Sequence, residues 1–309
     1  MTLALKDISA QEELLAPGHG LCPGCAHPVV VREVLHALNK PAVVSMATGC
    51  LEVSTTRFPR TAWRTSMIHS AFENSATTIG GVEAAYKALV RRGAMEEQDI
   101  AFVVFAGDGA TYDIGFQWLS GALERGHRFI YICLNNEGYM NTGIQRSGAT
   151  ILGAWTTTTP AGKVVPGKTE WRKDMTRIIA AHDIPFVAQT TVHSWKDLMT
   201  KVRQADAAGG PTFINVLSPC ARGWRYEPQD TMSISRLAVD TCMWPLYEVD
   251  NGEWKLNYKP REKKPVTEWL KSQGRFSHLL RPENLPVVEE IQRRVDREWE
   301  NLLQRCGKS

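Results

Sequence analysis

Two stretches of this chain, residues 100–106 and 129–134, are continuously apolar rather than alternating between apolar and polar positions. Such runs are typical of strands buried on both faces of a parallel sheet. Shorter or more mixed strands are predicted at residues 42–46, 186–191 and 211–217. Segments with helical spacing separate these strands. This alternation predicts an α/β fold with a doubly wound parallel sheet.

Helices are predicted where apolar positions recur every three to four residues. These segments are residues 29–38, 70–92, 114–125, 171–182 and 194–207. Ser70 with Glu73, and Ser194 with Asp197, form capping-box patterns, so two of the helices are expected to begin at these serines. Residues 1–16 are expected to form an arm or a first helix. Residues 141–167 are rich in Gly, Thr and Pro and predict a long loop, which in a compact domain is usually functional.

The character of the chain changes after residue 245. Residues 246–258 alternate around Asp250-Asn251-Gly252 and predict a hairpin. Residues 259–265 are basic and flanked by proline, as in a surface linker. Residues 286–305 predict an amphipathic helix, and its apolar stripe is expected to be a docking face for this chain or a partner. We therefore expect an α/β domain over residues 1–245 and a C-terminal arm, hairpin plus helix, over residues 246–309.

Composition narrows the class of protein. The 309 residues are 43% hydrophobic and 22% charged, as in a core-forming globular protein. A net charge of +3 is too small to predict nucleic-acid binding. The chain shows no secretory signal and no apolar run of about 18 residues, and its seven Cys do not suggest a secreted disulfide framework. A cytoplasmic protein that binds neither nucleic acid nor membrane is expected.

Polar loops follow the two most apolar strands. Gly107-Asp108-Gly109 follows residues 100–106, and Asn135-Asn136-Glu137-Gly138 follows residues 129–134. Parallel strands place both loops at one edge of the sheet, where α/β proteins bind ligands. The glycines let backbone amides approach a phosphate, and Asp108 and Asn136 offer oxygens to Mg²⁺. Each loop alone fits an ordinary turn. The pair, with a helix between, resembles the diphosphate-binding motif of thiamine diphosphate enzymes.

Cysteines mark further candidate positions. Cys22-Pro23-Gly24-Cys25 fits a zinc site, a redox dithiol, an iron–sulfur ligand pair or two buried thiols. A zinc ribbon needs a second C-x-x-C, which is missing, and a thioredoxin-like dithiol needs a preceding strand. Cys50 and Cys220 each follow a predicted strand, and each fits either a ligand or a packed small residue. His69, on a candidate site loop, fits either a structural or a catalytic role.

Six stretches together resemble the β subunits of 2-oxoacid:ferredoxin oxidoreductases, most of all those of the pyruvate-specific enzymes. They are HGLCPGCAHP, ATGCLEVSTTRFPRTAW, IHSAFENSATT, GDGATYDIG, NNEGYMNTGIQRSGAT and PCARGWR. They lie in the family's order between residues 18 and 247, about three quarters of the chain. The resemblance implies the fold of a thiamine diphosphate-binding domain.

The resemblance also implies the cofactors and their ligands. One [4Fe-4S] cluster falls on Cys22, Cys25, Cys50 and Cys220, and Mg²⁺ falls on Asp108, Asn136 and the Gly138 carbonyl. Thiamine diphosphate contacts fall on His27, Cys50, Gly107, Asp108, Gly109, Ala110, Asn136, Glu137, Gly138, Tyr139, Met140 and Asn141. Relatives often have Glu at the position of His27, so this chain departs from the pattern there. Cys133, Cys242 and Cys306 fall outside the motifs.

The activity implied is thiamine diphosphate-dependent oxidative decarboxylation of a small 2-oxoacid, with electrons passing through the cluster to ferredoxin. The glutamate that activates the cofactor comes from another subunit in this family, so no catalytic residue is assigned here and activity is expected only in a complex. An α subunit supplies the pyrimidine domain, and γ and δ subunits, separate or fused, carry further clusters. With pyruvate, coenzyme A accepts the acyl group.

Pyruvate is the first choice of substrate, and other substrates and classes stay open. After residues 145–150 the pyruvate-type pattern usually continues with Pro and a small polar residue, whereas this chain has Ile151-Leu152. Relatives also use oxalate, which yields CO₂ without coenzyme A, or 2-oxobutyrate, 2-oxoglutarate, branched-chain 2-oxoacids and arylpyruvates. A non-redox thiamine carboligase or decarboxylase would need no set of four cysteines. A non-catalytic electron-transfer or zinc-stabilised subunit would need no paired diphosphate loops.

Overall fold

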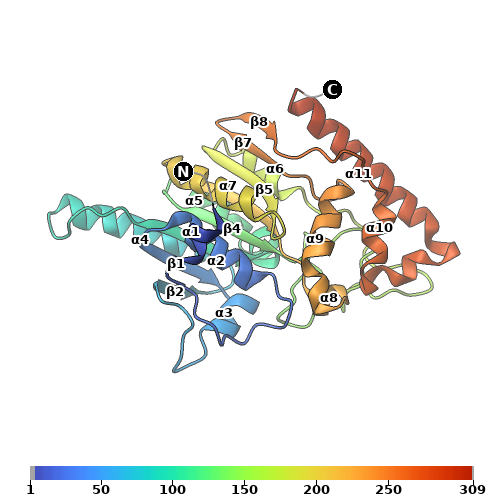
Figure 1. Cartoon of the computed structure of the whole chain (residues 1–309), viewed down its shortest axis with the longest axis horizontal. Coiled ribbons are helices and arrows are strands. Elements are labelled where there is room, and N and C mark those ends of the chain that lie inside the picture. The colour runs from blue at the N-terminus through green and yellow to red at the C-terminus, as the bar shows by residue number, and fades with distance from the viewer. Residues whose placement is uncertain (1–3, 308–309) are drawn as a thin grey trace.

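The computed structural model describes residues 4–307, and in this part of the chain eight strands form one sheet (Figure 1). The strands are β1 (Ala42–Ala47), β2 (Ser66–Ser70), β3 (Ala101–Gly107), β4 (Ile130–Asn135), β5 (Phe186–Thr191), β6 (Thr212–Leu217), β7 (Tyr247–Asp250) and β8 (Glu253–Leu256). Their order is β2-β1-β3-β4-β6-β5-β7-β8. The first six are parallel, and β7 and β8 are antiparallel.

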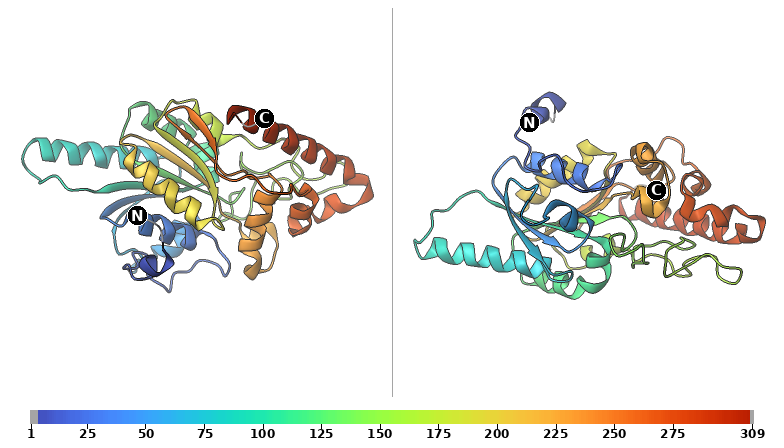
Figure 2. Two further views of the ribbon diagram at one scale, coloured as in Figure 1. Left: turned by 45° about the horizontal axis from the view of Figure 1, so that its top comes forward. Right: turned by 90° about the horizontal axis from the view of Figure 1, so that it is seen from below.

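Helices cover both faces of the sheet. They are α1 (Leu5–Ser9), α2 (His27–Leu38), α3 (Cys50–Thr55), α4 (Ser75–Arg91), α5 (Phe116–Glu124), α6 (Met175–Ala180), α7 (Trp195–Ala207), α8 (Ala221–Trp224), α9 (Thr231–Asp240), α10 (Val266–Lys271) and α11 (Leu285–Arg305). One core contains α2 and α7, and the other contains α4, α5, α6, α9, α10 and α11. The views in Figure 2 show α4 and α11 extending away from the sheet at opposite ends of the molecule. The doubly wound α/β prediction is confirmed.

One predicted helix start is wrong, and one predicted capping box does not form. Residues 66–70 form the edge strand β2, and Ser70 Oγ lies 3.0 Å from Ser45 Oγ of the neighbouring strand, so α4 begins only at Ser75. β2 is largely exposed and therefore lacks the apolar run that would reveal it. α7 begins at Trp195 with Ser194 at its N-cap position, as predicted, but the Ser194 side chain makes no cap hydrogen bond and its Oγ lies 3.1 Å from His193 Nδ1. Asp197 accepts from Thr190 and pairs with Lys201.

The C-terminal segment follows the predicted pattern. β7 and β8 form the hairpin and extend the sheet next to β5. The buried residues of α11 are Val288, Ile291, Val295, Trp299 and Leu302, which form the predicted apolar stripe. This stripe packs into the core of the same chain, together with residues of α9 and α10. The domain division at residue 245 stays a prediction. Within the described residues, no helix is both long and apolar enough to cross a membrane.

Glu33 on α2 is expected to make stability depend on pH. Its Oε2 is shielded from solvent without a hydrogen-bond partner among the described residues, and burial raises the pKa of Glu33 from 4.5 to about 8. Because the pKa of Glu33 is higher in the folded protein than in the unfolded chain, the contribution of Glu33 to the free energy of unfolding is fully present below pH 4.5. That contribution is lost as the pH rises through 8. Glu33→Gln should therefore raise the free energy of unfolding by roughly 2–4 kcal/mol at pH 8, and by less than half of that at pH 5.5.

Urea unfolding of the purified protein at the two pH values measures this effect. Glu83→Gln is the matched control, because Glu83 is buried but pairs with Lys87 and His127, and its pKa is lowered overall. That control should destabilise the protein at pH 8. A Glu33→Gln variant that is no more stable than the parent at pH 8 would contradict the prediction.

Candidate functional site

The loops that follow β1, β3, β4 and β6 meet at the carboxyl edge of the sheet, because these four strands are parallel neighbours. A hollow that is partly open to solvent lies between the first three loops and α2. The predicted cofactor residues that line it are His27, Cys50, Gly107, Gly109, Ala110, Asn136, Gly138, Tyr139, Met140 and Asn141. Asp108 and Glu137 are fully buried beside it. Thr48, Phe72 and Thr142 also line the hollow, and sequence reasoning did not assign them.

Glycines shape the wall of the hollow. A Cβ atom at Gly107 would meet nothing within 4 Å, so this position leaves open space beside the backbone. At Gly109 the reverse holds, because a Cβ would overlap the Tyr139 ring, whose hydroxyl donates to the Gly109 carbonyl at 3.1 Å. The first glycine thus leaves room for a phosphate, and the second allows the two loops to approach each other closely.

Asp108 is the buried carboxylate of the site. Its Oδ1 accepts from the Asn136 backbone N–H at 3.0 Å, and its Oδ2 accepts from Ser147 Oγ at 2.5 Å. Burial raises the pKa of Asp108 to about 7, although the hydrogen bonds from Ser147 and Asn136 lower it. Ser147 lies in the NNEGYMNTGIQRSGAT stretch, but nothing in its local pattern indicated that it would contact Asp108.

The Asn136 side-chain amide lies between two acceptors. One of its terminal atoms is 2.8 Å from the Gly138 carbonyl oxygen and 3.0 Å from Asp108 Oδ1. With the amide nitrogen at this position, Asn136 donates to both oxygens. With the amide oxygen there, three oxygens converge on one another, as the protein ligands of a hard cation do. The predicted Mg²⁺ ligands therefore fit such an ion in type and placement.

Four cysteines approach the same edge. Cys22, Cys25, Cys50 and Cys220 are all free thiols, and Cys50 also lines the hollow. Burial, with smaller contributions from the charges of the other cysteines, raises the pKa of Cys25 and Cys50 to about 12. Every one of the six cysteine pairs interacts electrostatically in this way. The four cysteines that the sequence motifs indicated therefore lie near one another in the structure.

These sulfurs do not form a single-ion site. No group of three or more His, Cys, Asp or Glu side chains within residues 4–307 is placed to hold a metal ion. A four-iron cluster binds each cysteine through a different iron atom, so separate but neighbouring thiols are compatible with it.

Two histidines have different positions. His27 is buried in the wall of the hollow with Nε2 3.4 Å from Asn136 Nδ2, and burial lowers the pKa of His27 to about 4. It is therefore a neutral group in the wall of the hollow. His69 lies outside the hollow, where its Nε2 is 2.8 Å from Thr48 Oγ1 and its Nδ1 is 3.5 Å from Glu52 Oε1.

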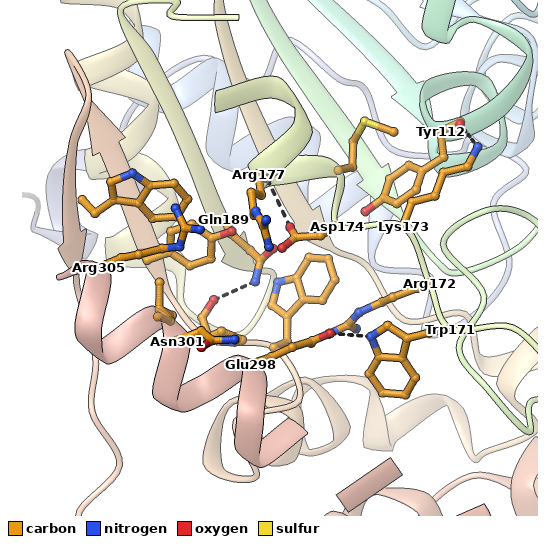
Figure 3. A pocket seen from close by; sticks show the side chains of 16 residues that line it. Tyr112, Trp171, Arg172, Lys173, Asp174, Arg177, Gln189, Glu298, Asn301 and Arg305 are labelled. Carbon is orange, nitrogen blue, oxygen red and sulfur yellow. Dashed lines mark hydrogen bonds between the residues drawn. The ribbon is translucent and has the colours of Figure 1, made fainter. Parts of the chain in front are cut away.

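A second cavity lies behind the site (Figure 3). Figure 3 shows Glu298, Asn301 and Arg305 of α11 facing the side formed by Trp171, Arg172 and Arg177. Local patterns did not indicate this cavity, because α11 and residues 171–177 are far apart in the sequence. Arg172 Nη1 lies 3.6 Å from Glu137 Oε1, so this segment supports the back of the cofactor loop.

Gly109→Ala should weaken cofactor binding. The added methyl group would overlap the Tyr139 ring and force the two loops apart, so we expect the affinity for thiamine diphosphate with Mg²⁺ to fall about tenfold or more. Titration of the purified complex with the cofactor measures the change. Gly81→Ala is the control, because a Cβ at Gly81 on α4 meets nothing within 4 Å. Equal affinities of the Gly109→Ala variant and the parent would contradict the prediction.

The sheet, its diphosphate-type loops and the hollow between them define a thiamine diphosphate-binding α/β protein. In agreement, the family model for the thiamine pyrophosphate enzyme C-terminal TPP binding domain matches residues 47–216. The chain is 50% identical to pyruvate synthase subunit PorB of Thermotoga maritima, over 96% of this chain and 94% of that one. It is 41% identical to ketoisovalerate oxidoreductase subunit VorB of Pyrococcus abyssi, over 94% and 93% of the two chains.

A solved structure shares the fold. It is the 2-oxoglutarate:ferredoxin oxidoreductase from Magnetococcus marinus, with a TM-score of 0.52 and 18% identity over 70% of this chain and 76% of that one. The chain therefore belongs to the β subunits of 2-oxoacid:ferredoxin oxidoreductases, and within them it resembles the pyruvate synthase subunits. It is a subunit of a thiamine diphosphate-dependent oxidoreductase that acts with partner subunits.

Proposed function

We propose that this chain is the subunit that holds thiamine diphosphate, Mg²⁺ and a [4Fe-4S] cluster in a complex that oxidatively decarboxylates a small 2-oxoacid and reduces ferredoxin. One observation carries the proposal. Four free cysteines gather beside the Asp108 carboxylate, the Asn136 side-chain amide and the Gly138 carbonyl oxygen at one edge of the sheet. A thiamine enzyme without electron transfer would need only the oxygens, and an electron-transfer subunit would need only the cysteines.

The residues of this chain would hold and orient the cofactors. Asp108, Asn136 and the Gly138 carbonyl would bind Mg²⁺, and the amides of the glycine-flanked loop would bind the diphosphate. Cys22, Cys25, Cys50 and Cys220 would bind the cluster. Cys50 lines the hollow, and the charge of Asp108 is among the causes that raise the pKa of Cys50. The cluster would therefore lie next to the cofactor. When bound, thiamine diphosphate supplies the carbon chemistry.

The site would be completed by a partner. Among the described residues that line the hollow, none is Asp or Glu. A carboxylate that activates the cofactor must therefore come from elsewhere, which supports a partner subunit that carries the pyrimidine domain. Further subunits with their own clusters would take the electrons to ferredoxin.

Pyruvate is the proposed substrate, with coenzyme A as acyl acceptor. The 50% identity to chains named pyruvate synthase supports it. The Ile151-Leu152 departure does not argue against it, because Ile151 is fully buried in the core and neither residue lines the hollow. Oxalate, for which no coenzyme A would be needed, and other 2-oxoacids are the alternatives.

The test uses the intact complex, purified without oxygen. Iron, acid-labile sulfide, zinc and thiamine are measured on one sample, and dye reduction is assayed with a panel of 2-oxoacids, with and without coenzyme A. The subunit with its partners should add about four iron atoms and one thiamine per copy of this chain. Thiamine without iron on this chain, or zinc without thiamine, would overturn the proposal. Oxalate turnover without coenzyme A would replace pyruvate as the substrate.

A further inference from the structure

Arg275 is a buried cation far from the predicted cofactor motifs in sequence. It lies on a 3₁₀ helix, Gly274–Leu280, and only 2% of its surface is exposed. Its Nη2 donates to Glu137 Oε2 at 2.6 Å, and its Nε donates to Gln273 Oε1 at 2.9 Å. The guanidinium group lies 3.8 Å from the centre of the Trp224 ring. One side chain from the C-terminal part thus contacts two loops of the candidate site.

The first of these loops contains Glu137. This residue stands between Asn136 and Gly138, whose oxygens are the proposed Mg²⁺ ligands, and it is fully buried. Its φ of 61° is unusual for a residue with a side chain and costs free energy unless the surroundings hold it. The Glu137 N–H donates to Asn135 Oδ1, and the Glu137 carbonyl accepts from Thr150 Oγ1. The carboxylate itself is held by Arg275, with Arg172 3.6 Å from its other oxygen.

The second loop contains Trp224, at the end of the short helix that follows Cys220. Trp224 is fully buried, and its Nε1 donates to the Asn136 carbonyl at 2.7 Å. In the same turn, the Gly223 N–H donates to Cys220 Sγ at 3.3 Å. The Trp224 indole therefore joins the cysteine turn to the cofactor loop, and the Arg275 guanidinium packs against both Trp224 and Glu137.

We propose that Arg275 is a positioning residue for two segments of the site, the loop at residues 135–138 and the turn at residues 220–224. Arg275 contacts the first through Glu137 and the second through Trp224, and so fixes the position of one segment relative to the other. This inference rests on the proposed function, because it concerns the loops that would hold Mg²⁺ and the cluster. Without the guanidinium group, the buried Glu137 carboxylate keeps only the Arg172 ion pair at 3.6 Å and has no hydrogen-bond donor to its side chain among the described residues, and burial of a charge that has lost its hydrogen-bonded partner is unfavourable. The loop would relax to expose the Glu137 carboxylate to water, and Asn136 and Gly138 would move with it.

Arg275→Met tests the inference in the intact complex, loaded with iron under anaerobic conditions. We expect the affinity for thiamine diphosphate with Mg²⁺, measured by titration against intrinsic tryptophan fluorescence, to fall about tenfold or more. Arg275→Lys keeps a positive charge and should retain part of the affinity. The midpoint potential of the cluster, measured by redox titration, should shift in Arg275→Met because the buried charge near Cys220 is lost.

A double variant separates positioning from simple charge balance. Arg275→Met with Glu137→Gln removes both charges. The Glu137 carboxylate that loses its hydrogen-bonded partner in Arg275→Met is then absent, so thermal stability should return toward that of the parent. Its cofactor affinity should stay low, because the side chain of residue 137 is then no longer bound to residue 275, and only the backbone hydrogen bonds to Asn135 and Thr150 hold this position. A double variant with parental affinity and parental potential would overturn the inference. If the complex that carries Arg275→Met alone does not assemble, the double variant still tests the inference, because it lacks the destabilising carboxylate.

The matched control removes another buried charge pair. Lys201 is fully buried on α7, where its Nζ donates to Asp197 Oδ2 at 2.7 Å and to the Gln189 carbonyl at 2.9 Å. Lys201→Met with Asp197→Asn should lower stability while cofactor affinity and cluster potential stay unchanged. If the parent complex binds no thiamine diphosphate, the proposed function and this inference both fall. If the parent and all variants bind it equally, only the inference about Arg275 fails.

Discussion

Replacement of Cys220 by serine should remove the iron–sulfur cluster from this subunit and abolish 2-oxoacid-dependent dye reduction by the complex. Cys220 is the N-cap residue of α8, three positions after the end of β6, and interacts electrostatically with Cys22, Cys25 and Cys50. Serine keeps the size of the side chain but is a poor ligand for iron, so one corner of the cluster would lose its anchor. We expect about four fewer iron atoms per copy of this chain and a loss of activity of at least about 100-fold.

Bound thiamine should stay near one per chain in this variant, because the diphosphate loops do not involve Cys220. Iron, acid-labile sulfide and thiamine are measured together on anaerobic preparations. Cys306→Ser is the control, because Cys306 directly follows the last residue of α11 and lies outside the cysteine motifs. It should keep full iron content and activity. A Cys220→Ser complex with the parental iron content would rule out the proposed ligand set.

Asp108→Asn should abolish cofactor binding while the cluster survives. The substitution keeps the shape of the side chain but removes the buried negative charge that faces Asn136 and Gly138. A neutral amide is a much weaker ligand for Mg²⁺ than a carboxylate, and the diphosphate is bound largely through that ion. We expect the affinity for thiamine diphosphate with Mg²⁺ to fall by roughly 100-fold or more, with a comparable loss of activity at limiting cofactor.

Equilibrium titration with the cofactor at fixed Mg²⁺ measures this loss, and iron analysis of the same samples should show an unchanged cluster. Asp250→Asn is the control, because Asp250 lies exposed at the end of β7. Ser147→Ala, which removes the donor to Asp108 Oδ2, should give a smaller loss than Asp108→Asn. Parental cofactor affinity in Asp108→Asn would show that Mg²⁺ is held elsewhere.

The sequence by itself determined the parallel strands, the loops that follow them and the stripe of α11. Residues 100–106 and 129–134 could be interpreted from local pattern because strands buried on both faces must be continuously apolar. Asp108 and Asn136 could be placed near each other because parallel neighbours end at the same edge. The hairpin around Asp250-Asn251-Gly252 and the buried stripe of α11 were likewise local signals, and the structure agrees with both.

Features that depend on contacts between segments far apart in the sequence were decided only by the tertiary structure. β2 escaped detection because an exposed edge strand needs no apolar run, and its neighbour β1 rather than its own sequence makes it a strand. Glu137 and Arg275 are 138 positions apart, and no periodicity in either segment indicates that they form a buried ion pair. The gathering of the four cysteines and the bond from Trp224 to Asn136 have the same origin. Periodicity reports which face of an element is buried, but the partner on that face is chosen by packing of the whole chain.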